Sequence, residues 1–473
     1  MNYLKKIGPL LTFLALLAAC TEEVDLDDEL DSYLNQNYAA SLLVLNGEAE
    51  TFSAYAPSDG TVYQDIKLIG TDGSNSANPN DVYLWEDNLY VICSGQNSVE
   101  KYDGSTMDYE GRIYLNPDET GFWPMIISPV GSDSMIGVSG YTDDEIVLVD
   151  LEAMDDPESS DFISSFEELD IDYNGNPETT TTPTTTNALG DNKKRGTTGL
   201  ASYGSYLYAG NVRYDSSIYL TDLNGDIIEY DGGKVQASGY FREGTLSIFE
   251  MDSAYETATL VSEINLQEEY EALGGDAYFP GDGLNPQSLF VLGDKLHIIC
   301  TGRNGGDTLY YTGSMYIPTL EEMGVEYEEG DEIPGTNADD GVILIMDLSD
   351  PSSPSGEKVL EVGGSPVGFR YSMDESNEIM YLTGVGYLLS YSYSAGSEEV
   401  LRGSDDPIVE ADDTTSDYYP HVLYAENYLY LSDYSNDELD ILSVSGSGSS
   451  SSYELEDELT IGDGPGASVY LSY

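Results

Sequence analysis

Cationic side chains are the residues of this sequence best suited to ligand chemistry, because they are scarce in a very acidic chain. The 473 residues include 88 Asp and Glu against 16 Lys and Arg, and the formal net charge is −72 at pH 7. Lys5 and Lys6 lie in the first 19 residues, and six of the remaining 14 cations fall in or beside connections between the repeated strands described below: Lys193, Lys194, Arg195, Arg213, Arg303 and Arg370. Together they would attract an anionic ligand and focus the electric field. Alternatively, each cation ties down its own loop through weak local ion pairs.

Two aromatic residues, Trp123 and His421, occur in the same kind of segment as these cations. Aromatic groups beside cations would suit a planar anion, a carboxylated sugar or a catecholate-type chelate. Trp123 precedes Pro124, so its alternative role is to cover the inner strands.

Oxygen ligands alternate with other residues at positions 170–176, as at the start of an EF-hand-type calcium loop. The candidate ligands are Asp170, Asp172, Asn174 and Asn176. Thr181 stands where that loop needs a bidentate glutamate, so an acidic turn is the alternative to a calcium site.

Enzymatic motifs are missing from the sequence. It has no G-x-S-x-G elbow, H-E-x-x-H, phosphate-binding loop or Cys/His metal cluster. His297 lies inside a predicted strand, which favours a core role, and carboxylate pairs are too common to be informative. The sequence therefore favours a protein that is not an enzyme but leaves the question open, because acid–base catalysis is not excluded. Nucleic-acid binding is excluded, because it needs a basic surface.

The element that must position these residues is the stretch 78–106, which recurs along the chain. Pro79 begins a short apolar strand, residues 89–92 form a second strand, and a third runs from Ser98 to Tyr102. Polar turns separate them, and a fourth strand passes through residues 112–115. Four short antiparallel strands in meander order form one blade of a β-propeller.

Altered copies of this stretch begin at Pro124, Gly199, Leu284, Pro366 and Pro420. A period near forty residues with insertions of variable length is typical of stacked blades. Residues 465–471 provide an isolated first strand, and residues 41–68 provide three strands without a first one. We therefore expect an all-β, seven-bladed β-propeller of four-stranded antiparallel blades over residues 41–473. Pairing of the N- and C-terminal strands would close the ring and remove exposed sheet edges.

Three insertions interrupt the blades, at about residues 159–195, 214–242 and 305–340. The first contains a Thr-rich run and joins two blades, and the other two separate the second and third strands of the fourth and fifth blades. In a meander these connections lie on one face of the ring, which we call the insertion-rich face. The six cations belong to connections on this face. Cys93 and Cys300 occupy equivalent places in separate blades, so the pattern predicts two buried small residues and no disulfide.

The N-terminus predicts export. Lys5 and Lys6 precede an apolar segment too short to span a membrane, and residues 17–20 (LAAC) look like a lipobox, so residues 1–19 are predicted to be a lipoprotein signal peptide. Acylated Cys20 would then anchor the protein in the lipid bilayer, and residues 20–40 would form an acidic tether. An ordinary secretory signal is the alternative. Because Thr21 is not an aspartate, we expect an outer-membrane lipoprotein, either periplasmic or exposed at the cell surface.

The strong negative charge has two interpretations. The first is a halophilic adaptation to a saline habitat, where salt screens the self-repulsion, and the second is binding of a specific polycation or calcium.

The repeated pattern, as in PNDVYLWEDNLYVICSGQNSV, resembles the bacterial YVTN or YncE-like propeller repeat, within the quinoprotein amine dehydrogenase β-chain-like superfamily. The resemblance covers about residues 41–473. It departs from the family in its long insertions and in having Cys93-Ser94 and Cys300-Thr301 where the signature closes on asparagine. The resemblance implies a seven-bladed ring in the cell envelope and no particular activity.

The function predicted from the sequence is an envelope binding module that captures or presents a ligand, perhaps an anion, at the insertion-rich face. It needs no cofactor, although calcium is an alternative. A cell-surface interaction or adhesion protein, assisted by calcium, is the second hypothesis, and a propeller enzyme is the third.

Overall fold

The structure is a computed structural model that describes most of the chain from Ser41 to Leu471. Its description leaves out residues 1–40, 71–76, 105–106, 116–123, 141–145, 153–196, 213, 220–228, 231–232, 235, 242–243, 254–257, 276–283, 303–340, 365, 367–370, 385, 411–419 and 472–473.

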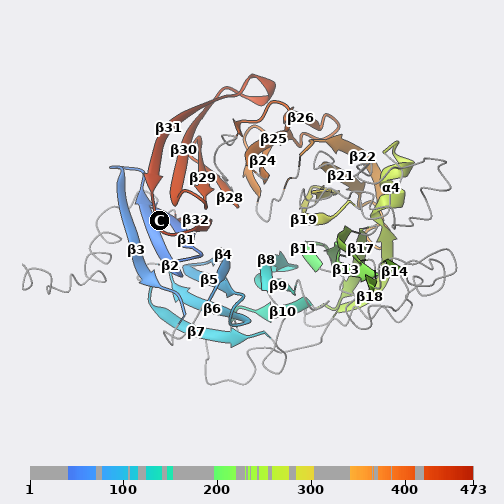
Figure 1. Cartoon of the computed structure of the whole chain (residues 1–473), viewed down its shortest axis with the longest axis horizontal. Coiled ribbons are helices and arrows are strands. Elements are labelled where there is room, and N and C mark those ends of the chain that lie inside the picture. Colours follow the sequence, from blue (N-terminus) through green and yellow to red (C-terminus); the bar gives the residue numbers. More distant parts are fainter. Residues whose placement is uncertain are drawn as a thin grey trace, which may run out of the picture.

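Seven antiparallel sheets are arranged as the blades of a ring, as the sequence predicts (Figure 1). We number the blades along the chain and give the strands of each from the ring centre outwards. Blade 1 contains β32 (Pro465–Leu471), β1 (Ser41–Asn46), β2 (Thr51–Ala56) and β3 (Thr61–Leu68). Blade 2 contains β4 (Pro79–Trp85), β5 (Asn88–Cys93), β6 (Ser98–Asp103) and β7 (Tyr109–Tyr114). Blade 3 has three described strands, β8 (Pro124–Val130), β9 (Ser132–Gly140) and β10 (Ile146–Asp150).

The remaining four blades follow the same order. Blade 4 contains β11 (Thr197–Tyr203), β12 (Tyr206–Asn211), β17 (Thr245–Met251) and β18 (Ala258–Asn265). Blade 5 contains β19 (Pro286–Leu292), β20 (Lys295–Cys300), β21 (Val342–Asp347) and β22 (Ser355–Glu361). Blade 6 contains β23 (Tyr371–Asp374), β24 (Ile379–Gly384), β25 (Tyr387–Ser392) and β26 (Glu399–Arg402), and β27 (Val409–Glu410) also pairs with β25. Blade 7 contains β28 (His421–Ala425), β29 (Tyr428–Asp433), β30 (Glu438–Ser445) and β31 (Ser452–Thr460).

Apolar residues fill both faces of each blade, because every blade packs against two neighbours. In β5, Leu89, Val91 and Cys93 belong to the core shared with blade 1, whereas Tyr90 and Ile92 belong to the core shared with blade 3. This alternation follows from the two-residue period of a strand. The seven core clusters correspond to the seven interfaces between neighbouring blades.

The ring is closed by pairing of the two ends of the propeller. Strand β32 pairs antiparallel with β1, and Leu42 lies opposite Tyr470. Leu42 and Val44 then pack against Tyr430 of blade 7, while Leu43 and Leu45 face blade 2. Closure therefore joins the termini within blade 1 and covers the inner edge of β1.

A β-bulge recurs near the start of the innermost strands. In blade 2, Pro79 lies opposite Cys93 but Asp81 lies opposite Ile92, so the inner strand carries one extra residue. Blade 5 repeats this arrangement, with Pro286 opposite Cys300 and Ser288 opposite Ile299. Proline fits the first position because no ladder N–H is needed there, and the bulge turns the next residues relative to their partners.

Short polar side chains of the first and second strands connect neighbouring blades. The Asp81 carboxylate accepts a hydrogen bond from the Ile127 backbone N–H at 2.9 Å, which joins blades 2 and 3. The Ser139 hydroxyl donates to the Thr198 carbonyl oxygen at 2.8 Å, and the Thr198 hydroxyl donates to the Pro286 carbonyl oxygen at 2.6 Å. These bonds link blades 2 to 5 in sequence, in addition to the apolar cores.

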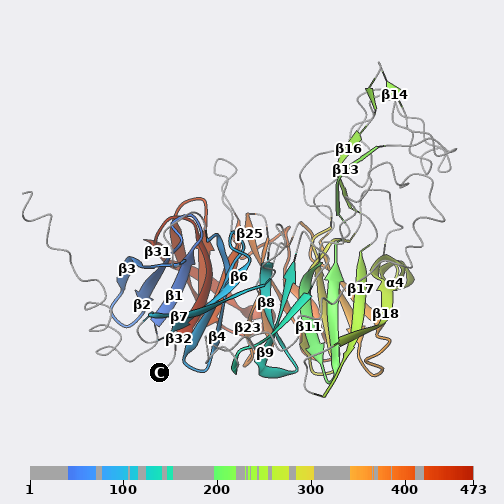
Figure 2. The same cartoon turned by 90° about the horizontal axis from the view of Figure 1, so that it is seen from below.

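Between β12 and β17 the chain forms two small hairpins. One pairs β13 (Tyr214–Tyr219) with β16 (Gln236–Phe241), and the other pairs β14 (Glu229–Tyr230) with β15 (Gly233–Lys234). Both stand away from one face of the ring (Figure 2). The helix α4 (Leu266–Ala272) follows β18, and its N-cap Asn265 accepts hydrogen bonds from the backbone N–H groups of Gln267 and Glu268. Within the described residues, no helix has the length and apolar character needed to cross a membrane.

Candidate functional site

A cavity of about 190 Å³ lies on the ring axis, lined by the innermost strands of four consecutive blades. Three of them contribute equivalent stretches, residues 126–129 of β8, 199–202 of β11 and 288–291 of β19, and Tyr371 of β23 completes the lining. Each innermost strand pairs on one side only, so its second edge presents backbone N–H and C=O groups toward the centre. The cavity wall therefore combines mostly apolar side chains with polar backbone groups.

Close packing of β11 against β19 shapes one wall of this cavity. A Cβ atom at Gly199 would lie 2.6 Å from Leu289 Cδ1 and 2.8 Å from the Leu289 backbone nitrogen. Glycine is therefore required at this position for steric reasons.

Three serine hydroxyls lie in the lining, and they differ in their hydrogen bonds. The Ser202 hydroxyl accepts from the Gly131 N–H at 3.1 Å and donates to the Pro129 carbonyl oxygen at 3.4 Å. Ser128 and Ser288 are 8% and 3% exposed, and no hydrogen bond joins their hydroxyls to another group among the described residues. Buried hydroxyls normally have a partner, so these two remain available to a molecule in the cavity.

Aromatic rings form the wall contributed by blades 5 and 6. The ring centroids of Phe290 and Tyr371 lie 4.3 Å apart. The His297 ring also stacks on Phe290, with 5.1 Å between the centroids. His297 Nδ1 lies 3.1 Å from the Tyr391 hydroxyl, and burial lowers the pKa of His297 to about 4. This histidine is therefore neutral at pH 7, and it has the core role that its position in a strand predicts.

No lining residue of the cavity, as the structure describes it, carries a charge. The same residues include no Asp, Glu, His, Lys or Cys that could act as a general base for Ser128 or Ser288. A serine nucleophile needs a base within hydrogen-bond reach, and the described lining supplies none to these two hydroxyls.

Of the site residues predicted from the sequence, His421 is the one that the structure describes. It begins β28 and is 4% exposed, and its Nδ1 lies 3.1 Å from the Ser468 hydroxyl of β32. The pair joins blades 7 and 1 inside the interface. The other predicted residues lie outside the described residues: Cys20, Trp123, Asp170, Asp172, Asn174, Asn176, Lys193, Lys194, Arg195, Arg213, Arg303 and Arg370.

The basic side chains that are described all form ion pairs with carboxylates. These pairs are Lys67–Asp108, Lys101–Glu110, Arg112–Glu100, Lys295–Glu357, Lys358–Glu398 and Arg402–Asp406. The most buried of these pairs is in blade 2, where Glu100 is fully buried and accepts from Arg112 Nε at 2.8 Å. Glu100 also accepts from the Tyr102 hydroxyl and from the Gly70 N–H. Local pairing thus accounts for six cations, none of which belongs to the predicted ligand-binding set.

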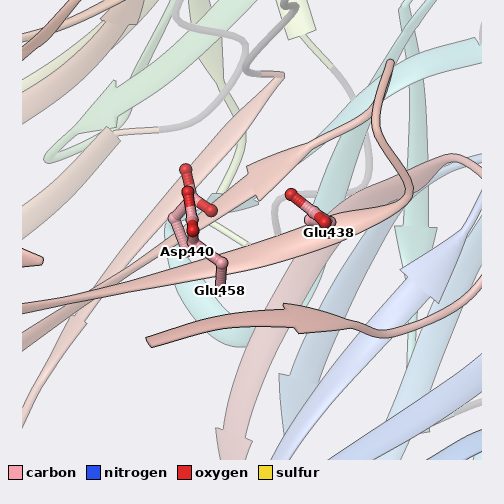
Figure 3. A group of neighbouring side chains, drawn as sticks. All are labelled: Glu438, Asp440 and Glu458. Atoms are coloured by element: carbon pink, nitrogen blue, oxygen red, sulfur yellow. The ribbon is translucent and has the colours of Figure 1, made fainter. Parts of the chain in front are cut away.

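Three carboxylates gather on the outer part of blade 7, on β30 and β31 (Figure 3). Asp440 lies directly opposite Glu458 in the ladder, and Glu438 is two residues away on the same face as Asp440. Their nearest oxygens lie within 4.8 Å of one another, so they could offer oxygen ligands to a cation. The sequence does not single out this group, because carboxylates are abundant along the chain and the sequence does not specify which residues of β30 and β31 lie side by side.

Asparagine occupies the end of the second strand in two blades, the position at which the YVTN signature closes. Asn46 and Asn211 are both fully buried, and each Nδ2 donates to a third-strand serine, Ser53 at 2.7 Å and Ser247 at 2.9 Å. The repeat at 78–106 does not predict these two asparagines, because it has Cys93 at this position. Cys93 and Cys300 are free and fully buried in separate interfaces, as predicted, and burial raises the pKa of both thiols.

Comparison with known structures supports the propeller fold. A candidate 6-phosphogluconolactonase from Bacteroides fragilis aligns at a TM-score of 0.52 and 9% identity, over 92% of this chain and 98% of its own. A second one, from Bacteroides uniformis, has a TM-score of 0.52 and 10% identity, over 92% of this chain and 100% of its own. AztD from Citrobacter koseri aligns at 0.44 and 11% identity, over 92% of this chain and 98% of its own. No protein-family model matches the sequence, and no curated protein matches it.

Proposed function

We propose that this protein is an exported binding protein whose propeller holds a small ligand noncovalently on the ring axis. The observation that carries the proposal is the open cavity lined by the innermost strands of blades 3 to 6. Ligand sites in proteins are typically concave, largely apolar and furnished with a few polar groups, and this cavity has those properties. Catalysis is not part of the proposal, because the described lining offers hydroxyls without a base.

The cations of the insertion-rich face are proposed as a second, separate site, which would bind an anionic ligand outside the cavity. Arg213 and Arg303 directly follow Val212 and Gly302, at the ends of the second strands of blades 4 and 5. Arg370 directly precedes Tyr371, at the start of the first strand of blade 6. In a meander, second strands end on the face where first strands begin, so chain connectivity assigns all three arginines to one face of adjacent blades.

The envelope location rests on the sequence. The signal segment 1–19, the lipobox ending at Cys20 and the acidic residues 20–40 support a lipid-anchored protein, with the outer membrane as the proposed site. The resemblance to the YVTN or YncE-like repeat supports the same location. The insertions at about residues 159–195, 214–242 and 305–340 are proposed as walls around the mouth of the ring.

The first experiment is to purify the untagged protein from its native membrane and identify co-purifying small molecules by mass spectrometry after denaturation. A structure of the same preparation would then locate the molecule. Density in the cavity lined by Ser128 and Ser288 would support the proposal, whereas a structure of this preparation with that cavity empty would contradict it.

A second experiment tests the cations. For an anionic ligand, the double variant Arg303→Gln/Arg370→Gln should weaken binding at least about 10-fold, because charged hydrogen bonds are lost. The matched control is Arg402→Gln, whose side chain already pairs with Asp406 and should leave affinity unchanged. Equal affinity of the double variant and the control would show that Arg303 and Arg370 do not bind the ligand.

The proposed anchor is tested by Cys20→Ser. This substitution removes the acylated sulfur and should move the protein from the membrane fraction to the soluble fraction. Retention of the variant in the membrane fraction would contradict lipidation at Cys20.

A further inference from the structure

The lining of the axial cavity restricts the chemistry of its ligand. We infer that the cavity binds an uncharged, ring-shaped molecule that carries hydroxyl groups, and that Ser128 and Ser288 select this molecule. The inference rests on the proposed binding function. This inference names the ligand class and two specificity-determining residues for that same cavity.

The size of the cavity indicates one ring. A cavity of about 150 Å³ in a protein interior can hold a benzene-sized molecule. The axial cavity has about 190 Å³, so it has room for a six-membered ring with short substituents. A larger ligand would have to extend out of the cavity along the axis.

Electrostatics exclude charge from the part of the ligand inside the cavity. The described lining residues are Ile, Ser, Pro, Gly, Leu, Ala, Phe, Val and Tyr, and none supplies a counter-charge. The stacked His297 behind Phe290 is neutral at pH 7 and points its Nδ1 toward Tyr391. Burying an ion without a partner costs several kcal/mol, whereas a hydroxyl can exchange its water for Ser128, Ser288 or the unpaired backbone edges.

The two serines explain why the ligand should carry hydroxyls. Both side chains are more than nine-tenths buried, both belong to the lining, and neither hydroxyl is hydrogen-bonded to a described residue. They come from β8 and β19, two strands on opposite sides of β11 along the ring, so they can reach two separate positions of one ring. The apolar side chains Leu200 and Leu289 and the ring of Phe290 would contact the body of that ring.

The test compares three probes that share one six-membered ring: D-glucose, the anion D-glucuronate and the cation D-glucosamine at pH 7. Affinities would be measured by ligand-observed NMR and calorimetry, and the bound position by a structure with glucose. We expect glucose to bind in the cavity at least about 10-fold more tightly than either charged analogue.

Variants of the lining separate recognition from folding. Ser128→Ala and Ser288→Ala should each weaken glucose binding roughly 5- to 10-fold, the amount expected for one neutral hydrogen bond. Ser262→Ala is the matched control, because Ser262 lies on β18 outside the cavity and its hydroxyl donates to the Ser352 carbonyl oxygen at 2.9 Å. Thermal unfolding of all three variants would verify that the blades remain folded.

The outcomes distinguish this inference from the proposed function. If a charged analogue binds in the cavity as tightly as glucose, or if the Ser128 and Ser288 variants bind like the Ser262 variant, the ligand class is wrong but the binding site stands. If none of the three probes binds and the natively purified protein carries no ligand in the cavity, both the inference and the proposed function are wrong.

Discussion

The Ser468 hydroxyl and His421 Nδ1 lie 3.1 Å apart, although the two residues are 47 positions apart in the chain. Ser468 belongs to β32, which completes blade 1, and His421 begins β28 of blade 7. Both residues are 4% exposed. The ring is therefore closed twice over, by strand pairing within blade 1 and by a polar contact between the first and last blades.

Removal of β32 should open the ring. A chain that ends at Gly464 loses the partner of β1 and exposes that strand edge, so we expect aggregation and loss of a single cooperative unfolding transition. The measurement is size-exclusion chromatography together with thermal unfolding. A chain that ends at Leu471 serves as the control. A monomeric, cooperatively unfolding product of the shorter chain would show that closure is not required.

Substitution of Glu100 by Ala should destabilise the protein strongly. The Arg112 side chain is 8% exposed and would lose its carboxylate partner inside the fold, which costs roughly 3–5 kcal/mol in comparable buried pairs. Denaturant unfolding measures this change. Asp406→Ala breaks the exposed pair with Arg402 and should change stability by about 1 kcal/mol or less. Equal effects of the two substitutions would indicate that the blade 2 network contributes little.

His297 should make stability fall as the pH is lowered from about 6.5 to about 4. Its pKa is about 4 in the folded protein and about 6.5 in an unfolded chain, because burial disfavours the charged form. The unfolded state therefore binds an extra proton in this window, and stability that is fully present above pH 6.5 is lost by pH 4. The maximum loss is about 3 kcal/mol.

The variant His297→Phe isolates this effect from the titration of the many carboxylates. Phenylalanine keeps a ring beside Phe290 but cannot bind a proton. The unfolding free energy of the protein with His297, minus that of the His297→Phe variant, should decrease as the pH falls from 6.5 to 4. Parallel curves for the two proteins would contradict the lowered pKa of His297.

Gly199→Ala should disturb both stability and the cavity. The new Cβ would lie less than 3 Å from Leu289, including its backbone nitrogen, so β11 and β19 must move apart. Overpacking of this kind costs roughly 1–3 kcal/mol. Gly111→Ala is the control, because nothing lies within 4 Å of a Cβ there. Equal melting temperatures of the two variants would show that β11 can shift freely.

The carboxylates on blade 7 should make stability depend on salt. Asp440 and Glu458 lie directly opposite each other, and like charges in such a pair repel. Glu458→Gln should raise the melting temperature by about 1 °C at low ionic strength, and the gain should disappear at 1 M NaCl, where the Debye length is about 3 Å. A gain that persists at high salt would exclude charge repulsion as its cause.

The sequence by itself determined the architecture. Repeats near forty residues predict blades, and the two-residue alternation along residues 89–93 predicts a strand that contributes to two cores, which the structure confirms. The isolated strand at residues 465–471 predicts ring closure, and it pairs with β1. The burial of His297, Cys93 and Cys300 also followed from their places in the repeat. Such features are local, because strand period and turn chemistry act over a few residues.

Only the tertiary structure decided where the cavity lies and which groups face it. Ser128, Ser288 and Tyr371 are separated by up to 243 positions in the chain, and no local pattern distinguishes Ser128 from Ser202. Their difference arises because Ser202 meets Gly131 and Pro129 of the neighbouring blade, whereas Ser128 and Ser288 meet no described partner. The space left at the axis depends on how closely four blades pack, including the contact between Gly199 and Leu289. This is a property of the whole ring, which no single repeat encodes.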